Sequence, residues 1–316
     1  MKIFVTGVAG QLGHDVMNEL HKRGYEGIGS DIAPEYSGAA DGSPVTTMPY
    51  VAMDITDGDA VEKTLTDIAP DVVVHCAAWT AVDLAEDEDK QEKVWAINVD
   101  GTANIAKACK AIDAKMIYIS TDYVFDGQGE TPWDPDCKDY APLNVYGKTK
   151  LEGELAVANT LEKFFIVRIA WVFGTNGKNF IKTMLQVGKN HDKLTVVCDQ
   201  IGTPTYTYDL ARLLVDMLAT EKYGYYHATN EGGYVSWYDF AQEIFHQAAA
   251  IGFEEYDERH LTVSPVTTAE YGVSKATRPF NSRLDKSKLV REGFTPLPTW
   301  QDALSRYLKA ISIEEL

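Results

Sequence analysis

A tyrosine and a lysine four residues apart are the side chains of this sequence best suited to acid–base chemistry. Tyr146 and Lys150 fall in a helical pattern from about residue 143 to 158, which places both on one helix face, one turn apart. A free phenol titrates near ~10, and a nearby ammonium favours the phenolate. We therefore expect Lys150 to lower the pKa of Tyr146 toward neutrality. Because this spacing is also common on ordinary helix surfaces, the interpretation depends on the surrounding elements.

The start of the chain predicts a dinucleotide-binding turn. Residues 2–6 form a short apolar, β-branched run, and three glycines in the order G-x-x-G-x-x-G follow before a helical pattern. Glycines at such a turn let a pyrophosphate approach the backbone, and the helix N-terminus offers free N–H groups and a positive dipole end. A glycine-rich turn without a ligand is the alternative. The predicted cofactor contacts on this turn are Gly7, Gly10, Gln11, Leu12 and Gly13.

A carboxylate ends the second predicted strand, which covers about residues 25 to 30. Asp31 lies eighteen residues beyond Gly13, a spacing suited to hydrogen bonding of the adenosine ribose. Its charge would repel a 2′-phosphate, and no Arg or Lys follows before Lys63, so the local sequence favours NADH over NADPH. Further cofactor contacts are expected at the ends of the next two strands, at Asp54, Ile55, Ala77 and Ala78.

Later apolar runs predict buried parallel strands at residues 71–75, 115–120 and 163–170. The second of these delivers Thr121 to the carboxyl edge of the sheet, where ligands bind in open α/β folds. A hydroxyl there could hydrogen-bond a substrate carbonyl oxygen together with the phenol of Tyr146 and stabilise the charge that develops on it. The predicted catalytic set is therefore Thr121, Tyr146 and Lys150.

Three other polar features are less specific. The acidic cluster at residues 83–89 is typical of a solvated helix start. A long helix predicted from about residue 90 to 112 carries Asn98, either as a polar kink residue or as a functional one. Arg278 lies in an irregular stretch, where an arginine could meet a phosphate or form a surface ion pair.

Residues 1–170 are expected to form mainly a dinucleotide-binding domain. Residues 171–316 are expected to form mainly a smaller substrate-binding lobe, with some chain crossing back to the first domain. Within this second part, Ser236 and Asp239 have the capping-box spacing that opens a helix, and Thr299 and Asp302 repeat it before the last helix.

Composition limits the class of protein. The chain has 316 residues, 45% of them hydrophobic, and a formal net charge of −18, which argues against nucleic acid or an anionic membrane as the main partner. No apolar run approaches the ~20 residues that cross a bilayer, and the N-terminus enters a strand without a signal peptide. The four cysteines and seven histidines show no disulfide or metal-ligand spacing. We expect a cytoplasmic protein without a metal site.

Several separated blocks resemble the dTDP-4-dehydrorhamnose reductase family of the extended short-chain dehydrogenase/reductase superfamily. The resemblance runs from residue 1 to about 307, and its specific blocks are residues 81–86, 120–127, 146–154, 168–174, 199–205 and 278–284. It implies an α/β fold with a Rossmann-like, doubly wound parallel sheet and a smaller C-terminal α/β lobe. It also implies hydride transfer from NADH or NADPH to C4 of dTDP-4-dehydro-6-deoxy-L-mannose, a dTDP-sugar, which yields dTDP-L-rhamnose.

The resemblance also implies residue roles. Tyr146 would protonate the developing alkoxide, Lys150 would lower the pKa of Tyr146 and hold the nicotinamide ribose, and Thr121 would orient the carbonyl. The substrate pocket would be lined by Val82, Thr121, Asp122, Tyr123, Trp171 and Arg278. Some family members are described as magnesium-linked dimers held by glutamates. Here Asp15 and Gln301 stand at the candidate positions, so no metal is expected, although a homodimer is possible.

The residues also bear on three other functions. Dehydratases of the superfamily carry a carboxylate where this chain has Tyr123, so elimination would lack its base. A nucleotide-sugar epimerase, which needs only transient oxidation with retained NAD, stays open. A non-catalytic, reductase-like regulatory subunit could bind a dinucleotide without turnover, but it would not need an activated phenol.

Overall fold

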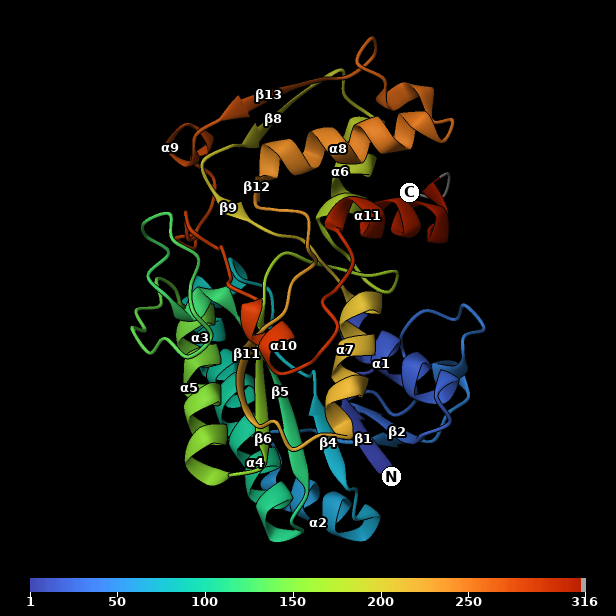
Figure 1. Cartoon of the computed structure of the whole chain (residues 1–316), viewed down its shortest axis with the longest axis vertical. Helices are drawn as coiled ribbons and strands as arrows, with labels where there is room; N and C mark the ends of the chain where they lie inside the picture. The colour runs from blue at the N-terminus through green and yellow to red at the C-terminus, as the bar shows by residue number, and fades with distance from the viewer. Residues whose placement is uncertain (314–316) are drawn as a thin grey trace.

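A seven-stranded parallel sheet forms the centre of the computed structural model, which describes residues 1–313 (Figure 1). Its order is β11-β6-β5-β4-β1-β2-β3, so the strand order reverses between β1 and β4. Ligands bind beyond the carboxyl ends of strands at such a reversal. The predicted doubly wound sheet is confirmed. The strands are β1 (Lys2–Thr6), β2 (Glu26–Asp31), β3 (Tyr50–Ala52), β4 (Val72–His75), β5 (Lys115–Thr121), β6 (Phe164–Ile169) and β11 (Gly224–His227).

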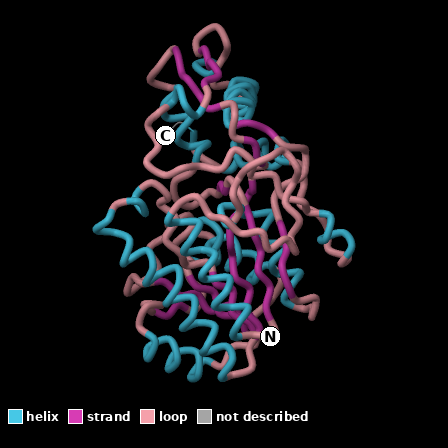
Figure 2. Tube along the Cα trace, turned by 90° about the vertical axis from the view of Figure 1, so that its left-hand side faces the viewer, coloured by secondary structure: helices cyan, strands magenta, loops and turns pink. Residues whose placement is uncertain are grey.

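Alternating side chains of the strands bury the two faces of this sheet under two helix layers. Figure 2 shows the helices of one layer in front of the strands. In β1, Ile3 and Val5 join one core with α1 (Gln11–Lys22) and α7 (Thr207–Leu218). The neighbouring Phe4 joins the core on the opposite face. The helices on that opposite face are α2 (Gly58–Ile68), α4 (Thr102–Ala111) and α5 (Val145–Thr160).

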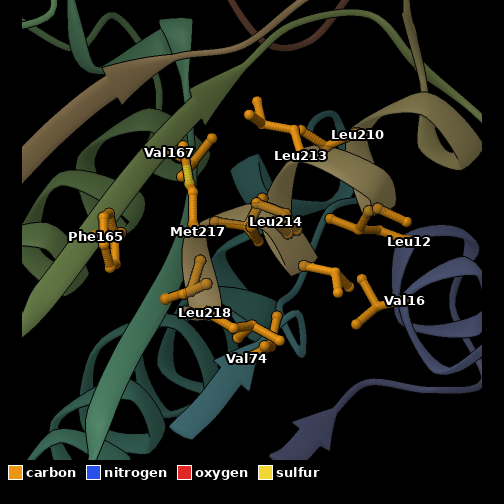
Figure 3. Close-up of a cluster of buried hydrophobic side chains, with 14 of the residues drawn as sticks. Leu12, Val16, Val74, Phe165, Val167, Leu210, Leu213, Leu214, Met217 and Leu218 are labelled. Atoms are coloured by element: carbon orange, nitrogen blue, oxygen red, sulfur yellow. The ribbon is translucent and has the colours of Figure 1, made fainter. Parts of the chain in front are cut away.

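Helix α7, from the C-terminal half of the chain, packs on the central sheet beside α1. Leucines of α7 such as Leu210 and Leu214 meet Leu12 and Val16 of α1 above the strand residue Val74 (Figure 3). The strand β11 follows α7 and pairs in parallel with β6 at the edge of the sheet. The proposed division of the chain near residue 170 stays a prediction, and its last three residues lie outside the described part.

Most remaining elements gather beyond the carboxyl ends of the sheet strands, at the top of Figure 1. They enclose a second apolar core that contains Phe173, Leu185, Phe240 and Leu304. The longer elements are α6 (Phe180–Gly188), β8 (Lys193–Val197), α8 (Trp237–Ala250), β13 (Thr262–Val266) and α11 (Trp300–Ala310). The short ones are β7 (Val172–Phe173), β9 (Ile201–Gly202), β10 (Thr205–Tyr206), β12 (Val235–Ser236) and α9 (Thr268–Tyr271). Helix α10 (Ser287–Arg291) lies instead beside β11, where Leu289 joins the core that contains α1 and α7 (Figure 1).

The predicted helix from residue 90 to 112 is wrong as a single element. It consists of α3 (Glu88–Trp95), a π-helical segment (Ala96–Gly101) and α4. The interruption contains Asn98, whose buried side-chain amide is hydrogen-bonded to the backbone of the loop after β4. Helices widen in this way where an inserted group disturbs the regular hydrogen-bond ladder.

Of the two predicted capping boxes, the structure confirms one. Ser236 and Asp239 satisfy each other's backbone N–H groups at the start of α8. Thr299 accepts from the N–H of Asp302, but the Asp302 carboxylate binds Arg306, so the second box is half formed. Among residues 1–313, no helix is long and apolar enough to span a membrane.

A buried ion pair fixes α5 to the sheet. Arg168 of β6 donates from Nε and Nη2 to the two carboxylate oxygens of Glu154, both at 2.8 Å, and neither side chain is exposed to water. The guanidinium also donates to the carbonyl of Pro135 and the hydroxyl of Tyr140. The guanidinium makes two parallel hydrogen bonds to the carboxylate, and its other N–H groups are also paired. This ion pair therefore fixes the position of α5 relative to the sheet.

We expect Arg168→Met to lower the free energy of unfolding by about 3–5 kcal/mol, because it leaves the Glu154 carboxylate buried and unpaired. Urea unfolding at pH 7 measures this change. The double variant Arg168→Met with Glu154→Gln should recover part of the loss. As a matched control, Asp113→Asn breaks the exposed pair with Lys163 and should cost less than about 1 kcal/mol. An unfolding midpoint for Arg168→Met equal to that of the parent would contradict the account.

Candidate active site

One cleft of about 710 Å³ opens at the carboxyl ends of the sheet strands. Its walls come from the ends of β1, β2, β4, β5 and β6, from the start of α5 and from segments of the C-terminal half. Every residue predicted from the sequence to contact cofactor or substrate lies in its wall. These residues are Gly7, Gly10, Gln11, Leu12, Gly13, Asp31, Asp54, Ile55, Ala77, Ala78, Val82, Thr121, Asp122, Tyr123, Tyr146, Lys150, Trp171 and Arg278.

The glycine turn fits a pyrophosphate. Gly7 has φ +72°, a left-handed conformation that favours glycine, and its N–H binds the carbonyl of Ser30 at 2.8 Å. A Cβ on Gly13 would collide with the Gly7 carbonyl, so α1 can begin this close to β1 only with glycine there. No residue among 1–313 accepts from the N–H groups of Gln11, Leu12 or Gly13, and no acidic side chain lies in the first turn of α1. These donors and the helix dipole suit an anion.

Asp31 stands at the end of β2, in the cleft wall. One of its carboxylate oxygens accepts from the N–H of Ala9 at 3.0 Å and the other from the N–H of Ile32 at 2.8 Å. The carboxylate thus braces the glycine turn, and each oxygen keeps a second lone pair for another donor. A ribose hydroxyl fits that capacity, whereas a phosphate would meet a negative charge.

Helix α5 carries the tyrosine and the lysine into the cleft. Its first turn is capped by Asn144, which accepts from the N–H of Gly147 at 2.8 Å. A Cβ on Gly153 would collide with the hydroxyl of Tyr118, so this glycine lets α5 lie close to β5. The amine of Lys150 then lies 4.1 Å from the centre of the Tyr118 ring, and only 3% of Lys150 is exposed.

The expected lowering of the Tyr146 pKa is wrong in this structure. Burial raises the pKa of Tyr146 well above its ordinary value, the charge of Asp122 adds to that effect, and a hydrogen bond with Thr121 opposes it. Burial also lowers the pKa of Lys150 to about 7, against which the charge of Glu154 acts. Loss of hydration on burial disfavours the charged form of each group, and it is the largest cause of both shifts. The phenol is protonated at neutral pH, which is the form that donates a proton.

The hydroxyl of Thr121 is engaged by its neighbours. It donates to the carboxylate of Asp122 at 2.9 Å and accepts from the N–H of Tyr123 at 3.2 Å. Burial raises the pKa of Asp122 to about 6, against hydrogen bonds from Ser282 and Thr121. Thr121 has a single proton, so it can donate to a substrate carbonyl only after turning away from Asp122.

Several aromatic rings form part of the cleft wall. Trp171 follows β6 in a left-handed conformation, φ +51°, and its ring stacks on Trp237 with centroids 3.6 Å apart. The ring of Phe180 packs against Trp237 at 4.5 Å, and Tyr123 meets Tyr146 edge to face at 5.6 Å. These rings give the cleft a flat apolar surface beside the catalytic set.

The acidic cluster at residues 83–89 is not merely solvated, because several of its carboxylates hold other segments at the cleft. Asp83 binds the guanidinium of Arg278 at 2.7 Å, and Arg278 also donates to the hydroxyl of Tyr123 at 3.2 Å. Glu86 accepts from the N–H of Val145 at the start of α5. The predicted ion pair of Arg278 is thus confirmed, and because Arg278 also lines the cleft, its contact with a phosphate stays a prediction.

Asn98 has a structural role. Its amide oxygen accepts from the N–H of Trp79 at 2.8 Å, and its nitrogen donates to the Trp79 carbonyl and the Thr149 hydroxyl. The π-helical segment therefore ties the loop after β4 to α5. This choice between the two interpretations needed the tertiary structure, since both partners lie far away in the sequence.

Beyond residue 174, three cleft residues were not predicted from the sequence: Lys178, Phe180 and Trp237. They lie in a loop, at a helix start and after a two-residue strand, where no strong pattern marks a site. The family-like sequence block at residues 168–174 ends just before Lys178 and Phe180. A signal was present in the stretch of residues 171–180, which mixes aromatic, glycine, asparagine and lysine residues as binding loops do.

The comparisons with known proteins cover nearly the whole chain. The family model described as RmlD substrate binding domain matches residues 1–313. A dTDP-4-dehydrorhamnose reductase of Aggregatibacter actinomycetemcomitans is 38% identical over 96% of this chain and 97% of its own.

The chain belongs to the dTDP-4-dehydrorhamnose reductase family.

Two solved structures of this family agree with the fold. A reductase from Clostridium acetobutylicum has a TM-score of 0.85 at 38% identity, covering 98% of this chain and 99% of its own. A reductase from Bacillus anthracis, in complex with NADP, has a TM-score of 0.84 at 36% identity, covering 98% and 100%. The family membership confirms the resemblance seen in the sequence blocks. The roles of individual residues stay predictions.

Asp15, where the sequence predicts no metal bridge, lies buried in α1. Its carboxylate accepts from the hydroxyl of Thr207 at 2.5 Å, and burial raises its pKa to about 7. In the described part of the chain, no group of three or more His, Cys, Asp or Glu side chains is arranged to hold a metal ion.

We expect Lys150→Met to stabilise the fold at low pH. The folded-state pKa of about 7 lies below the unfolded value of 10.5, so the unfolded chain binds more protons between these values. The cost of burying the ammonium is therefore full below pH 7 and vanishes above about pH 10.5. Urea unfolding should show a gain for the variant at pH 6 that is smaller at pH 9.5 by about 3 kcal/mol.

The charge-matched control for this experiment is Lys107→Met, which removes an exposed lysine of α4. It should shift stability equally little at both pH values. If the gain of Lys150→Met over the parent is the same at pH 6 and pH 9.5, the lysine is not titrating as described.

Proposed function

We propose that this protein reduces the 4-keto group of dTDP-4-dehydro-6-deoxy-L-mannose with NADH or NADPH, forming dTDP-L-rhamnose. The observation that carries the proposal is one cleft at the sheet's switch point that joins a dinucleotide turn to Thr121, Tyr146 and Lys150. Family membership supports it, because the curated relatives are reductases of this kind. The protein is then an oxidoreductase of nucleotide-sugar metabolism.

The residues present fit a nicotinamide dinucleotide. The N–H groups at the start of α1 would hold the pyrophosphate, Asp31 the adenosine ribose, and Lys150 the nicotinamide ribose. Small side chains at Ala77 and Ala78 leave room against the backbone at the end of β4. When bound, the reduced nicotinamide supplies the hydride that enters at C4 of the sugar.

The phenol of Tyr146 supplies the proton. As the carbonyl carbon accepts the hydride, negative charge develops on its oxygen, and a protonated phenol beside it neutralises that charge. Burial keeps Tyr146 protonated at neutral pH. Thr121, once turned from Asp122, donates to the same oxygen and fixes its direction. The buried amine of Lys150 would donate hydrogen bonds to the nicotinamide ribose. Among residues 1–313, no acceptor is hydrogen-bonded to this amine.

The sugar nucleotide would occupy the aromatic side of the cleft. The Trp171 ring, backed by Trp237, offers a flat surface for a deoxysugar or thymine. Val82, Asp122 and Tyr123 would line the sugar, and Arg278 would lie near the substrate.

Asp31 favours NADH in this proposal, because its carboxylate faces the cleft and no cation follows it before Lys63. The Bacillus anthracis relative was crystallised with NADP, so the family does not settle the preference for this chain. A cytoplasmic location and a homodimer complete the proposal.

A stoichiometric assay tests the reaction. With dTDP-4-dehydro-6-deoxy-L-mannose, we expect one NADH consumed for each sugar reduced, and a kcat/KM for NADPH about tenfold lower because of the Asp31 charge. Absorbance at the dihydronicotinamide band and chromatography of the sugar nucleotide measure both. Conversion of the sugar without net NADH loss would favour the epimerase, and binding without any conversion would favour the regulatory subunit.

We expect Tyr146→Phe to lower turnover by ~100-fold or more, because general acid catalysis of this kind contributes that factor. NADH affinity, measured by fluorescence titration, should change less than about twofold, since the ring stays in place. Tyr271→Phe, at an exposed tyrosine, is the matched control and should leave both values unchanged. Parent-like turnover in Tyr146→Phe would remove the phenol from the mechanism.

A further inference from the structure

One lysine of the cleft has no role in the chemistry described so far. Lys178 lies in the loop between β7 and α6 and lines the cleft, although its side chain is mostly exposed. No hydrogen bond or ion pair joins it to another residue of the described chain. The two other cations in the cleft wall already have a partner or a proposed role. Arg278 pairs with Asp83, and Lys150 is buried against Tyr118.

The loop that carries Lys178 is fastened to the glycine turn. The buried side chain of Asn176 donates to the carbonyls of Ala9 at 2.8 Å and Gly10 at 3.2 Å. Asn179 donates to the side-chain oxygen of Gln11 at 3.1 Å, in the first turn of α1. Contacts on both sides of Lys178 therefore hold its backbone against the predicted pyrophosphate site.

A second lysine stabilises the same loop by hydrogen bonds to its backbone. The amine of Lys182, in α6, donates to the carbonyl of Thr175 at 2.6 Å and to that of Gly177 at 2.9 Å. Burial lowers the pKa of Lys182, which pairs with no carboxylate among residues 1–313. This lysine is used to hold the loop, so of the two only Lys178 is available to a ligand.

The positive charge of Lys178 at the cleft contrasts with the acidic character of the protein. The chain has a formal net charge of −18, and Asp31 and Asp54 face the adenosine side of the cleft. A pyrophosphate carries two negative charges at neutral pH, which the dipole of α1 offsets only in part. A free ammonium beside the start of α1 supplies the remaining compensation.

We infer that Lys178 is a binding residue for the pyrophosphate of the dinucleotide, delivered by the loop between β7 and α6. This inference rests on the proposed function, because it places the dinucleotide on the glycine turn. The dTDP-sugar also contains a diphosphate. The contacts of Asn176 and Asn179 go to the cofactor turn, so the structure favours the dinucleotide.

Fluorescence and calorimetric titrations of the full-length protein test the inference without turnover. We expect Lys178→Met to raise the Kd for NADH about threefold to tenfold at low salt, and the Kd for ADP-ribose by the same factor. The difference from the parent should shrink as salt rises, because salt screens an exposed charge pair. Lys178→Arg keeps the charge and should bind nearly as the parent does. Binding of dTDP should not change.

The control is Lys107→Met, an exposed lysine of α4 outside the cleft, which should bind NADH as the parent does. Unchanged NADH affinity in Lys178→Met at low salt would overturn the inference, as would weaker binding of dTDP without weaker binding of NADH. The proposed function fails separately. A parent protein that binds NADH but converts no keto sugar would refute the reductase and leave the test of Lys178 intact.

Discussion

The position of Lys150 against the ring of Tyr118 is the constraint on which the active site depends. An amine this deeply buried is tolerated because α5 is held from several sides at once. Gly153 lets α5 come close to β5, and the Glu154 carboxylate is locked to Arg168 one turn beyond the lysine. Since Tyr146 precedes Lys150 by one turn, the same restraints place the phenol. Desolvation then decides both pKa values, keeping the phenol protonated and the amine near half charge at neutral pH.

The cleft is completed by segments that return from far along the chain. Asn144 at the start of α5 donates to the carbonyl of Thr277, and Arg278 next to it reaches Asp83 across the cleft mouth. Asn176 ties the loop after β7 to the glycine turn. The substrate side and the cofactor side thus share restraints, so a sugar and a dinucleotide would be held at a fixed separation. Positioning of this kind contributes much of an enzyme's rate enhancement.

The central sheet and the composition of the cleft could be predicted from the sequence because they follow from local patterns. Each apolar run ended in polar or small residues, and parallel strands bring their carboxyl ends to one edge. Thr121 and Asp31 lie at that edge for this reason. The sign of the Tyr146 pKa shift could not be predicted, because it depends on the balance between burial and charge, which the spacing of two residues does not contain.

Other errors have the same origin in long-range contacts. Asn98 disturbs a helix because of partners at Trp79 and Thr149, and the acidic cluster is held by Arg278 from the far end of the chain. Trp237 and Lys178 follow elements too short to show a period. Propensity and spacing describe neighbours along the chain, whereas these side chains were placed by neighbours in space.

The central claim is that one cleft brings a reduced nicotinamide to the sugar carbonyl beside Tyr146. Transfer of deuterium from NADH labelled at C4 of the nicotinamide tests it most directly, with the product sugar analysed by NMR and mass spectrometry. We expect one deuterium, on C4 of the sugar, when the transferred face of the nicotinamide carries the label. Product that contains no deuterium with either face labelled, or that carries it at another carbon, would contradict the account.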